Sequence, residues 1–273
     1  MVKWILSFIP ENFAKTKLYI EPFVGSGIVG FNLNPKEAIF SDINPHIIRF
    51  YKDLQENVIT PEEVKKFLTS EGEKLRKKGE YYYYEVRERF NKEPNSLDFI
   101  FLNRASFNGV IRFNMKGEFN VPFCKKENRF SKSYITKIYN EVKWLYLRIK
   151  SNNWNFLNKD FREVIKYANY KSLVYLDPPY IARYSDYFNK WTEQDEQDLF
   201  TMLTSAKFYF ILSSWLKNSF RENPYIARYW KRGFKIYTKE HFYIVKGKKE
   251  NSIYEAIITN IDKETNVICY SNR

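Results

Sequence analysis

The sequence predicts an α/β fold, in which a mostly parallel sheet has helices on both faces and a mainly helical segment is inserted into it. At both ends of the 273-residue chain, apolar strand-like runs alternate with helix-like segments. This alternation is typical of parallel sheets. The expected strands are residues 18–23, 38–41, 154–157, 172–177, 208–213 and 253–259.

The alternation stops in the middle of the chain, between about residues 51 and 150. Charged, amphipathic helices are expected at residues 61–77, 79–89 and 97–107, followed by a long helix at 131–148. Residues 109–123 alternate apolar and polar side chains around Met115-Lys116-Gly117, which is typical of a β-hairpin. Residues 1–50 and 151–273 are therefore expected to form the sheet domain, and residues 51–150 an inserted helical domain that carries a hairpin.

A polar motif follows one of the expected strands. Asp177-Pro178-Pro179-Tyr180 comes directly after the apolar run 173–176, and open α/β sheets bind ligands at the carboxyl ends of their strands. The prolines stiffen the backbone and donate no N–H, so the Asp177 carboxylate and the Pro178 carbonyl are acceptors beside an aromatic ring. This combination favours a planar amine on a heteroaromatic ring, such as a nucleobase amino group. The alternative is an ordinary turn that ends a strand.

A second motif concentrates glycine in a glycine-poor chain. Three of the 9 glycines fall in Gly25-Ser26-Gly27-Ile28-Val29-Gly30, after Glu21-Pro22-Phe23. Such a loop allows close approach to its backbone, and it matches the dinucleotide fingerprint of dehydrogenases. Asp42, however, follows sooner than the acidic residue of nicotinamide-binding units, and Glu21-Pro22 precedes the loop. S-adenosylmethionine is preferred, because it offers ribose hydroxyls to Asp42 but has no pyrophosphate.

Composition favours a polyanionic partner. The chain has 45 Lys and Arg against 32 Asp and Glu, a formal net charge of +13, which makes binding to nucleic acid favourable and salt-dependent. A solvated basic surface is the alternative. The 2 cysteines and 2 histidines have no metal-site spacing, so no metal is expected and a reducing, cytoplasmic setting is the default. The apolar start, residues 1–9, is too short for a membrane span, and no membrane partner is expected.

The sharpest pattern lies in the inserted segment. Residues 103–114 read Asn-Arg-Ala-Ser-Phe-Asn-Gly-Val-Ile-Arg-Phe-Asn, and residues 119–122 read Phe-Asn-Val-Pro. With the glycine loop before it and Asp-Pro-Pro-Tyr after it, this order resembles the Dam-type (alpha-class, D12 class) DNA adenine-N6 methyltransferases, from about residue 19 to residue 260. The resemblance implies a Rossmann-like, S-adenosylmethionine-dependent catalytic domain at residues 1–50 and 151–273, and a target-recognition domain at residues 51–150.

The resemblance also implies a cofactor site and partners. The cofactor residues would be Glu21, Pro22, Phe23, Gly25, Gly27, Asp42, Asp160, Phe161 and Trp4. Asp160 is equally suited to cap a helix. The expected partner is double-stranded DNA in a prokaryotic cytoplasm, and the resemblance admits a restriction endonuclease that acts on the same site.

The implied reaction uses the Asp-Pro-Pro-Tyr motif. The target adenine would leave the DNA stack and enter a pocket at the sheet edge. Tyr180 would stack on its ring, and Asp177 and the Pro178 carbonyl would accept the two N6 hydrogens, with Pro179 completing the motif. The protein would contribute mostly positioning and charge stabilisation.

The hairpin of the inserted segment is expected to read the DNA. Arg112 is the first candidate, since a bidentate arginine on guanine is the commonest specific contact in the major groove. The expected DNA contacts are Phe107, Asn108, Val110, Arg112, Asn114, Asn120 and Pro122. The asparagines at 114 and 120 are equally suited to holding the hairpin together. Arg112, Val110 and Pro122 resemble the set used by enzymes that read GATC, which is the expected site; a helical lid without DNA contact is the alternative.

The sequence departs from the family pattern at its start. Lys3-Trp4 is followed by Ile5-Leu6-Ser7, where the family has a lysine segment that contains glycine. Trp4 is therefore either the matching cofactor residue or a chance match. The alternatives to adenine methylation in DNA are an inactive, DNA-binding relative and an enzyme that methylates another amine, such as cytosine N4 or an adenine in RNA.

Overall fold

The computed structural model describes residues 1–9, 13, 18–114, 116–180, 191–242, 244–245, 248–249 and 252–262. They form two compact units. Unit 1 holds residues 1–41 and the described residues from 159 onward, and unit 2 holds residues 42–158. Within the described ranges, no helix is long and apolar enough to cross a membrane.

A seven-stranded sheet with the strand order β3-β2-β1-β4-β5-β9-β6 is the framework of the fold. Its strands are β1 Tyr19–Glu21, β2 Glu37–Ser41, β3 Asn153–Leu157, β4 Leu173–Leu176, β5 Tyr209–Asn218, β6 Lys235–His241 and β9 Ile253–Thr259. Strands β2, β1, β4 and β5 are parallel, whereas β9 is antiparallel to β5 and β6. A separate pair is formed by β7 Ile244–Val245 and β8 Lys248–Lys249.

All six strands that the sequence predicts are present in the seven-stranded sheet, and one further strand of this sheet was not predicted. Strand β6 has the sequence KIYTKEH and is mostly half-buried or exposed. It pairs only with β9 at the edge of the sheet, so it lacks the apolar run that identifies an internal strand. Strand β5 extends to Asn218, beyond its predicted end at residue 213.

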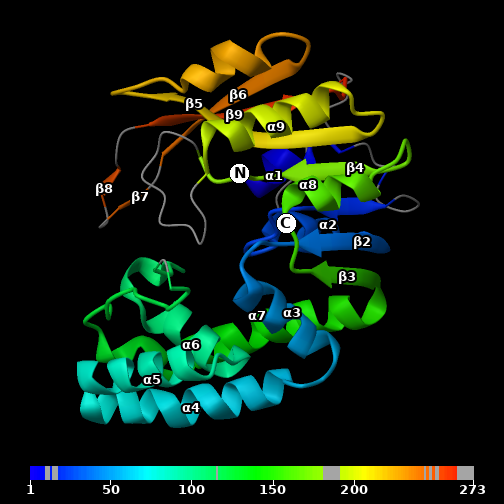
Figure 1. The fold of residues 1–273 in the computed structure, drawn as a ribbon. Coiled ribbons are helices and arrows are strands. Elements are labelled where there is room, and N and C mark those ends of the chain that lie inside the picture. The colour runs from blue at the N-terminus through cyan, green and yellow to red at the C-terminus, as the bar shows by residue number, and fades with distance from the viewer. Residues whose placement is uncertain are drawn as a thin grey trace. The chain divides into compact units, whose positions relative to one another are not determined.

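Helices cover both faces of the sheet in unit 1 (Figure 1). They are α1 Val2–Leu6, α2 Ile28–Leu33, α8 Phe161–Val164, η3 Ile165–Tyr167, α9 Glu193–Thr204 and η4 Ile226–Trp230. Helices α8 and α9 pack with η4 on a core that includes Ile20, Val174 and Phe210. On the opposite face, α2 lies so close to β1 that a Cβ at Gly30 would come within 2.4 Å of the Glu21 carboxylate. The predicted α/β fold is confirmed.

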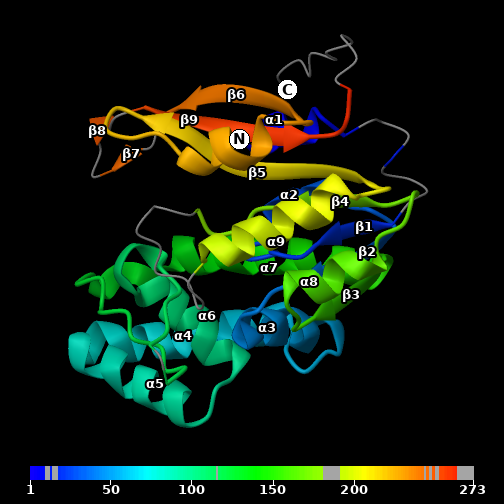
Figure 2. The same ribbon diagram turned by 45° about the horizontal axis from the view of Figure 1, so that its top comes forward.

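Unit 2 is mainly helical, and the helices predicted for it are present. They are α3 Pro45–Gln55, α4 Pro61–Lys78, α5 Glu80–Lys92, α6 Ser96–Ala105, η1 Phe107–Gly109, η2 Glu127–Phe130 and α7 Lys132–Ser151. Helices α4 and α5 run side by side (Figure 2). Two buried carboxylates join three of them through one arginine, because Arg89 of α5 donates to Asp98 of α6 at 2.8 Å and to Glu71 of α4 at 3.1 Å.

The predicted hairpin is a reversal of the chain without regular strands. Isolated antiparallel bridges join Phe113 to Phe119 and Ser106 to Phe123. The Phe113–Phe119 bridge has a backbone bond on each side, from the Asn114 N–H to the Glu118 carbonyl at 2.9 Å and from the Asn120 N–H to the Arg112 carbonyl at 3.2 Å. The Asn91 side chain of α5 accepts from the Phe119 N–H at 2.8 Å and donates to its carbonyl at 3.2 Å. The hairpin is thus held against α5.

The two ends of unit 2 are hydrogen-bonded to each other. The Asp42 N–H donates to the Leu157 carbonyl at 3.3 Å. The Asn158 side chain donates to the carbonyls of Asp42 and Ile43 at 2.9 and 3.0 Å. The segment from residue 42 to residue 158 therefore begins and ends at one place.

Candidate functional site

The Asp-Pro-Pro-Tyr motif lies at the carboxyl end of a central strand. All four residues of β4 are buried, which is typical of a strand covered on both faces. The chain then emerges, so that Asp177 is exposed while Pro178 is buried and Pro179 and Tyr180 are half-buried. The Asp177 carboxylate is therefore open to a ligand, on a backbone that the buried proline holds in place.

The glycine loop follows β1, the strand next to β4. From β1 the chain proceeds to β2 on one side, and from β4 it proceeds to β5 on the other. The strand order therefore reverses between the neighbouring strands β1 and β4. Open α/β sheets bind ligands at the carboxyl ends of the strands at such a point. The two motifs chosen from the sequence flank this point.

The Asp177 carboxyl group has a raised affinity for a proton. Its burial among protein atoms, and second the negative charge of Glu255, raise the pKa of Asp177 to about 7. By surface area Asp177 is exposed, so water screens part of this effect. At neutral pH both protonation states of Asp177 are therefore accessible.

Glu255 is a site residue that the sequence did not indicate. It lies on β9, is 3% exposed, and accepts a hydrogen bond from the Tyr180 hydroxyl at 3.0 Å. Because Glu255 and Tyr180 are 75 positions apart, no spacing rule connects them. A charged residue within the otherwise apolar strand β9, whose residues are mostly buried, is the signal that could have found it.

Glu21, at the end of β1, is only 2% exposed. Its carboxylate accepts from the Tyr19 hydroxyl at 2.9 Å and from the Gly30 N–H at 3.1 Å. Glu21 therefore links the strand to the first turn of α2 and holds the glycine loop between them. Pro22, which follows it, is buried.

The glycines of the loop have different requirements. Gly25 and Gly27 both have positive φ, +45° and +62°. A Cβ on Gly27 would come within 2.1 Å of the Phe31 ring, whereas a Cβ on Gly25 would meet nothing within 4 Å. Gly27 is thus needed for packing, whereas the space on the side-chain side of Gly25 is open.

Aromatic rings lie beside the loop. Phe23 is 5.4 Å from Phe161 and 5.5 Å from Trp191, measured between ring centroids, and Phe161 and Trp191 are 5.3 Å apart. Trp191 was not predicted as a site residue. Asp160 caps α8 by accepting from the Arg162 N–H at 2.9 Å, as the alternative interpretation expected, and its carboxylate is 38% exposed.

Two of the predicted cofactor residues have contacts away from the loop. The Trp4 ring packs edge-on against Phe8 at 5.7 Å, and Phe8 packs against Tyr237 of β6. Asp42 is counted with unit 2, where its carboxylate accepts from the Asn44 N–H at 2.9 Å.

In unit 2 the hairpin has a buried side and an exposed side. The buried side chains are Phe113, Phe119, Val121 and Phe123. On the other side Phe107 is 51% exposed, its N–H donates to the Pro122 carbonyl at 2.9 Å, and Asn108 and Pro122 are exposed as well. Val110 and Arg112 are half-buried. The hairpin therefore presents most of the predicted DNA contacts on one side.

The two asparagines of the hairpin have structural partners. Asn120 accepts from the Arg112 guanidinium at 2.9 Å, which orients that side chain. Asn114 accepts from the N–H groups of Lys116 and Glu118 at 2.9 and 3.0 Å and so closes the turn. For Asn114 these bonds match the structural alternative.

Comparison with known proteins decides the family. The pattern of the D12 class N6 adenine-specific DNA methyltransferases matches residues 1–245. The chain belongs to this class of methyltransferases. It is 35% identical over 283 residues to the type II methyltransferase M.MjaIII of Methanocaldococcus jannaschii, covering 94% of each chain. It is 36% identical over 171 residues to the DNA adenine methylase of Haemophilus influenzae, covering 61% of this chain and 56% of that one.

Among solved structures, the rRNA methyltransferase aviRa from Streptomyces viridochromogenes aligns with 94% of this chain and 80% of its own at 12% identity, with a TM-score of 0.36. This likeness is too low to support a conclusion. The class itself selects the adenine N6 group of DNA among the amines that the sequence left open, and it excludes the dehydrogenase interpretation.

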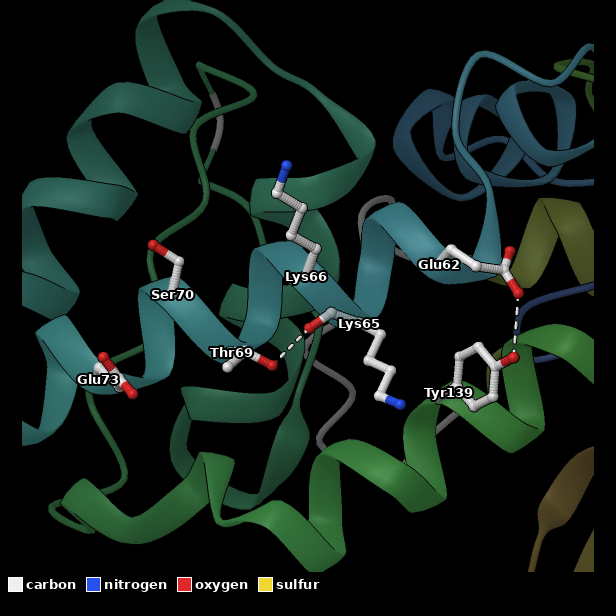
Figure 3. Close-up of a pocket in the computed structure, with 7 residues that line it drawn as sticks. All are labelled: Glu62, Lys65, Lys66, Thr69, Ser70, Glu73 and Tyr139. Carbon is white, nitrogen blue, oxygen red and sulfur yellow. Dashed lines mark hydrogen bonds between the residues drawn. The ribbon is translucent and has the colours of Figure 1, made fainter.

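One further concavity lies away from the motifs of the methyltransferase. It is a groove between α4 and α7 (Figure 3), lined by Glu62, Lys65, Lys66, Thr69, Ser70, Glu73 and Tyr139. Across it the Tyr139 hydroxyl donates to Glu62 at 3.0 Å. It contains none of the predicted site residues. In the part of the chain that the structure describes, no three potential metal ligands come together.

Proposed function

We propose that this adenine methyltransferase takes its methyl group from S-adenosylmethionine and transfers it to an adenine flipped out of duplex DNA, within GATC. The observation that carries this proposal is the pair of motifs at the point between β1 and β4 where the strand order reverses. An exposed carboxylate and a half-buried tyrosine stand on one side of it, and an open glycine loop on the other.

The residues beside β1 fit this cofactor. The open space at Gly25 accommodates a ligand against the backbone. The half-exposed Asp160 carboxylate has room to accept from an adenine amine, and the rings of Phe23 and Phe161, with Trp191, offer an apolar surface. When bound, S-adenosylmethionine supplies a methyl group that is already activated on a sulfonium cation. Glu21 holds the loop in shape, and Asp42 would accept from the ribose hydroxyls.

Asp177 and the Pro178 carbonyl would accept the two hydrogens of the adenine N6 amine. The deprotonated carboxylate accepts a hydrogen bond from the N–H and also stabilises the positive charge that develops on nitrogen. The ionised form of Asp177 is therefore the active one. Tyr180 would stack on the adenine ring. The contribution of these groups is to orient the amine and to stabilise its charge.

The hairpin of unit 2 would identify the site on DNA. Arg112, oriented by Asn120, would donate to the O6 and N7 atoms of a guanine. The exposed side chains of Phe107, Asn108 and Pro122 would contact the duplex around the flipped base. On this assignment unit 2 is the target-recognition domain. A restriction endonuclease that cuts the same site when it is unmethylated would be the cognate partner.

The test is transfer of a labelled methyl group from S-adenosylmethionine to duplexes that differ only in the target site. We expect N6-methyladenine in a GATC duplex and none when its adenine is replaced or its sequence is permuted. Replacing the target adenine with 2-aminopurine reports flipping, because the fluorescence of that base rises when it leaves the stack. Methylation in another sequence would overturn the GATC assignment alone, and transfer without a fluorescence change would overturn base flipping.

A further inference from the structure

We infer that Glu255 is a positioning residue of the active site, which fixes the ring of Tyr180 and sets the charge state of Asp177. This inference deepens the proposed function and rests on the roles that it gives to Asp177 and Tyr180. Its starting point is a buried carboxylate that the Asp-Pro-Pro-Tyr motif does not contain.

Glu255 has a fixed position in the sheet. It lies on the antiparallel strand β9, level with Trp215 of β5 and Lys239 of β6. A strand fixed on both sides by hydrogen bonds is a rigid support, whereas Tyr180 follows a strand end as part of a loop. The bond from the Tyr180 hydroxyl to Glu255, at 3.0 Å, therefore ties a side chain that follows the strand end to one within the sheet.

A hydroxyl that donates to a carboxylate makes a charge-assisted hydrogen bond, which is stronger than a neutral one. An aromatic ring rotates about two side-chain bonds, and fixing its far end restricts both. A ring that must stack on an incoming base gains from being held in place beforehand, since less conformational freedom is lost on binding.

Glu255 stands close enough to Asp177 for its negative charge to disfavour ionisation of that carboxyl group. The cationic methyl donor, and then the methylated amine, carry the opposite charge, so two acidic groups at this edge stabilise the reacting pair. Among titratable and charged groups, Tyr175 interacts electrostatically with both Asp177 and Glu255. Tyr180 donates to Glu255, and Lys239 of β6 is level with Glu255.

The test compares three substitutions with a control. Glu255→Ala removes the acceptor and the charge, Glu255→Gln keeps an acceptor and removes the charge, and Tyr180→Phe removes the hydroxyl alone. Glu240→Gln is the control, because Glu240 is an exposed carboxylate on the neighbouring strand β6. The measurements are kcat, KM for S-adenosylmethionine and the pH dependence of kcat/KM.

We expect Glu255→Ala and Tyr180→Phe each to lower kcat by about tenfold to a hundredfold, with little change in KM. Combining them should lower kcat no further than either does alone, because both remove one interaction. Glu255→Gln should move the acid limb of the pH profile to lower pH by about one unit, a shift that a purely structural role would not produce. Glu240→Gln should match the wild type.

The inference is overturned if the two single losses multiply in the double variant, or if the acid limb of Glu255→Gln stays in place. The Asp177→Ala variant distinguishes a failure of the proposed catalytic roles from a failure of the role given to Glu255. Full activity in Asp177→Ala would refute the proposed roles of the motif, and this inference with them. An inactive Asp177→Ala together with unaffected Glu255 variants refutes the inference alone.

Discussion

At the scale of single residues, the proposed mechanism makes the reaction depend on the protonation of Asp177. The ionised form would accept the hydrogens of the amine, and because the pKa of Asp177 is raised to about 7, this form is lost as the pH falls through neutrality. We therefore expect kcat/KM to rise with pH between about 6 and 8 and then to level off. The measurement is the pH dependence of methyl transfer with both substrates below saturation. A profile that is flat down to pH 5 would show that Asp177 keeps an ordinary pKa.

Arg112 carries the second prediction at this scale. The hydrogen bond that the Arg112 guanidinium donates to the Asn120 side chain holds it in one orientation, which a lysine cannot reproduce. Arg112→Lys and Arg112→Ala should both lose about 1–3 kcal/mol of discrimination at one base pair. The measurement is the methylation rate on duplexes with a single changed base pair. Asn120→Ala should give a smaller loss at the same base pair, and a uniform loss across all duplexes would assign Arg112 to the phosphate backbone instead.

At the scale of elements, the sequence predicts those helices, strands and loops that a local pattern of residues determines. The buried run of β4, the amphipathic helices α4 and α7 and the loop before α2 all have strong local signals, and they are where the sequence placed them. Strand β6 was missed because an edge strand with charged residues has no such signal. The pairing of Tyr180 with Glu255 and the binding of the hairpin by Asn91 were missed because they depend on residues distant in the sequence.

The network between α4, α5 and α6 gives a prediction about stability. Burial acts to raise the pKa of Glu71. Hydrogen bonds from Lys74, Tyr82 and Arg89 outweigh this effect and lower that pKa below its usual value. The stabilisation is therefore present above the unfolded pKa, about 4.3, and is lost as the pH falls through the lower, folded value. We expect the free energy of unfolding to decrease as the pH is lowered through this range.

The measurement is chemical denaturation at pH 7 and at pH 4. Glu71→Gln should lower the free energy of unfolding at pH 7 by about 1–3 kcal/mol and should show a weaker pH dependence than the wild type. Glu73→Gln is the matched control, since Glu73 is exposed on the same helix. Equal pH dependence in the wild type and Glu71→Gln would remove Glu71 from this account.

At the scale of the whole molecule, the net charge of +13 should dominate the affinity for DNA. Each phosphate that the protein neutralises releases counterions, so six such contacts would reduce binding on the order of a thousandfold between 50 and 200 mM salt. The measurement is the Kd for a labelled duplex across this range. A loss below about tenfold would mean that the basic side chains lie away from the DNA.

The hydrogen bonds that join Asp42 to Leu157 and Asn158 have an evolutionary consequence. A segment whose entry and exit meet can be exchanged as a cassette without redirecting the chain on either side. Residues 42–158 of a relative that methylates a different sequence could be joined to the remainder of this protein at Ser41 and Lys159. The resulting chimera should retain the chemistry and acquire the donor's sequence preference, so new specificities in such enzymes could arise by recombination at two points rather than by many separate substitutions.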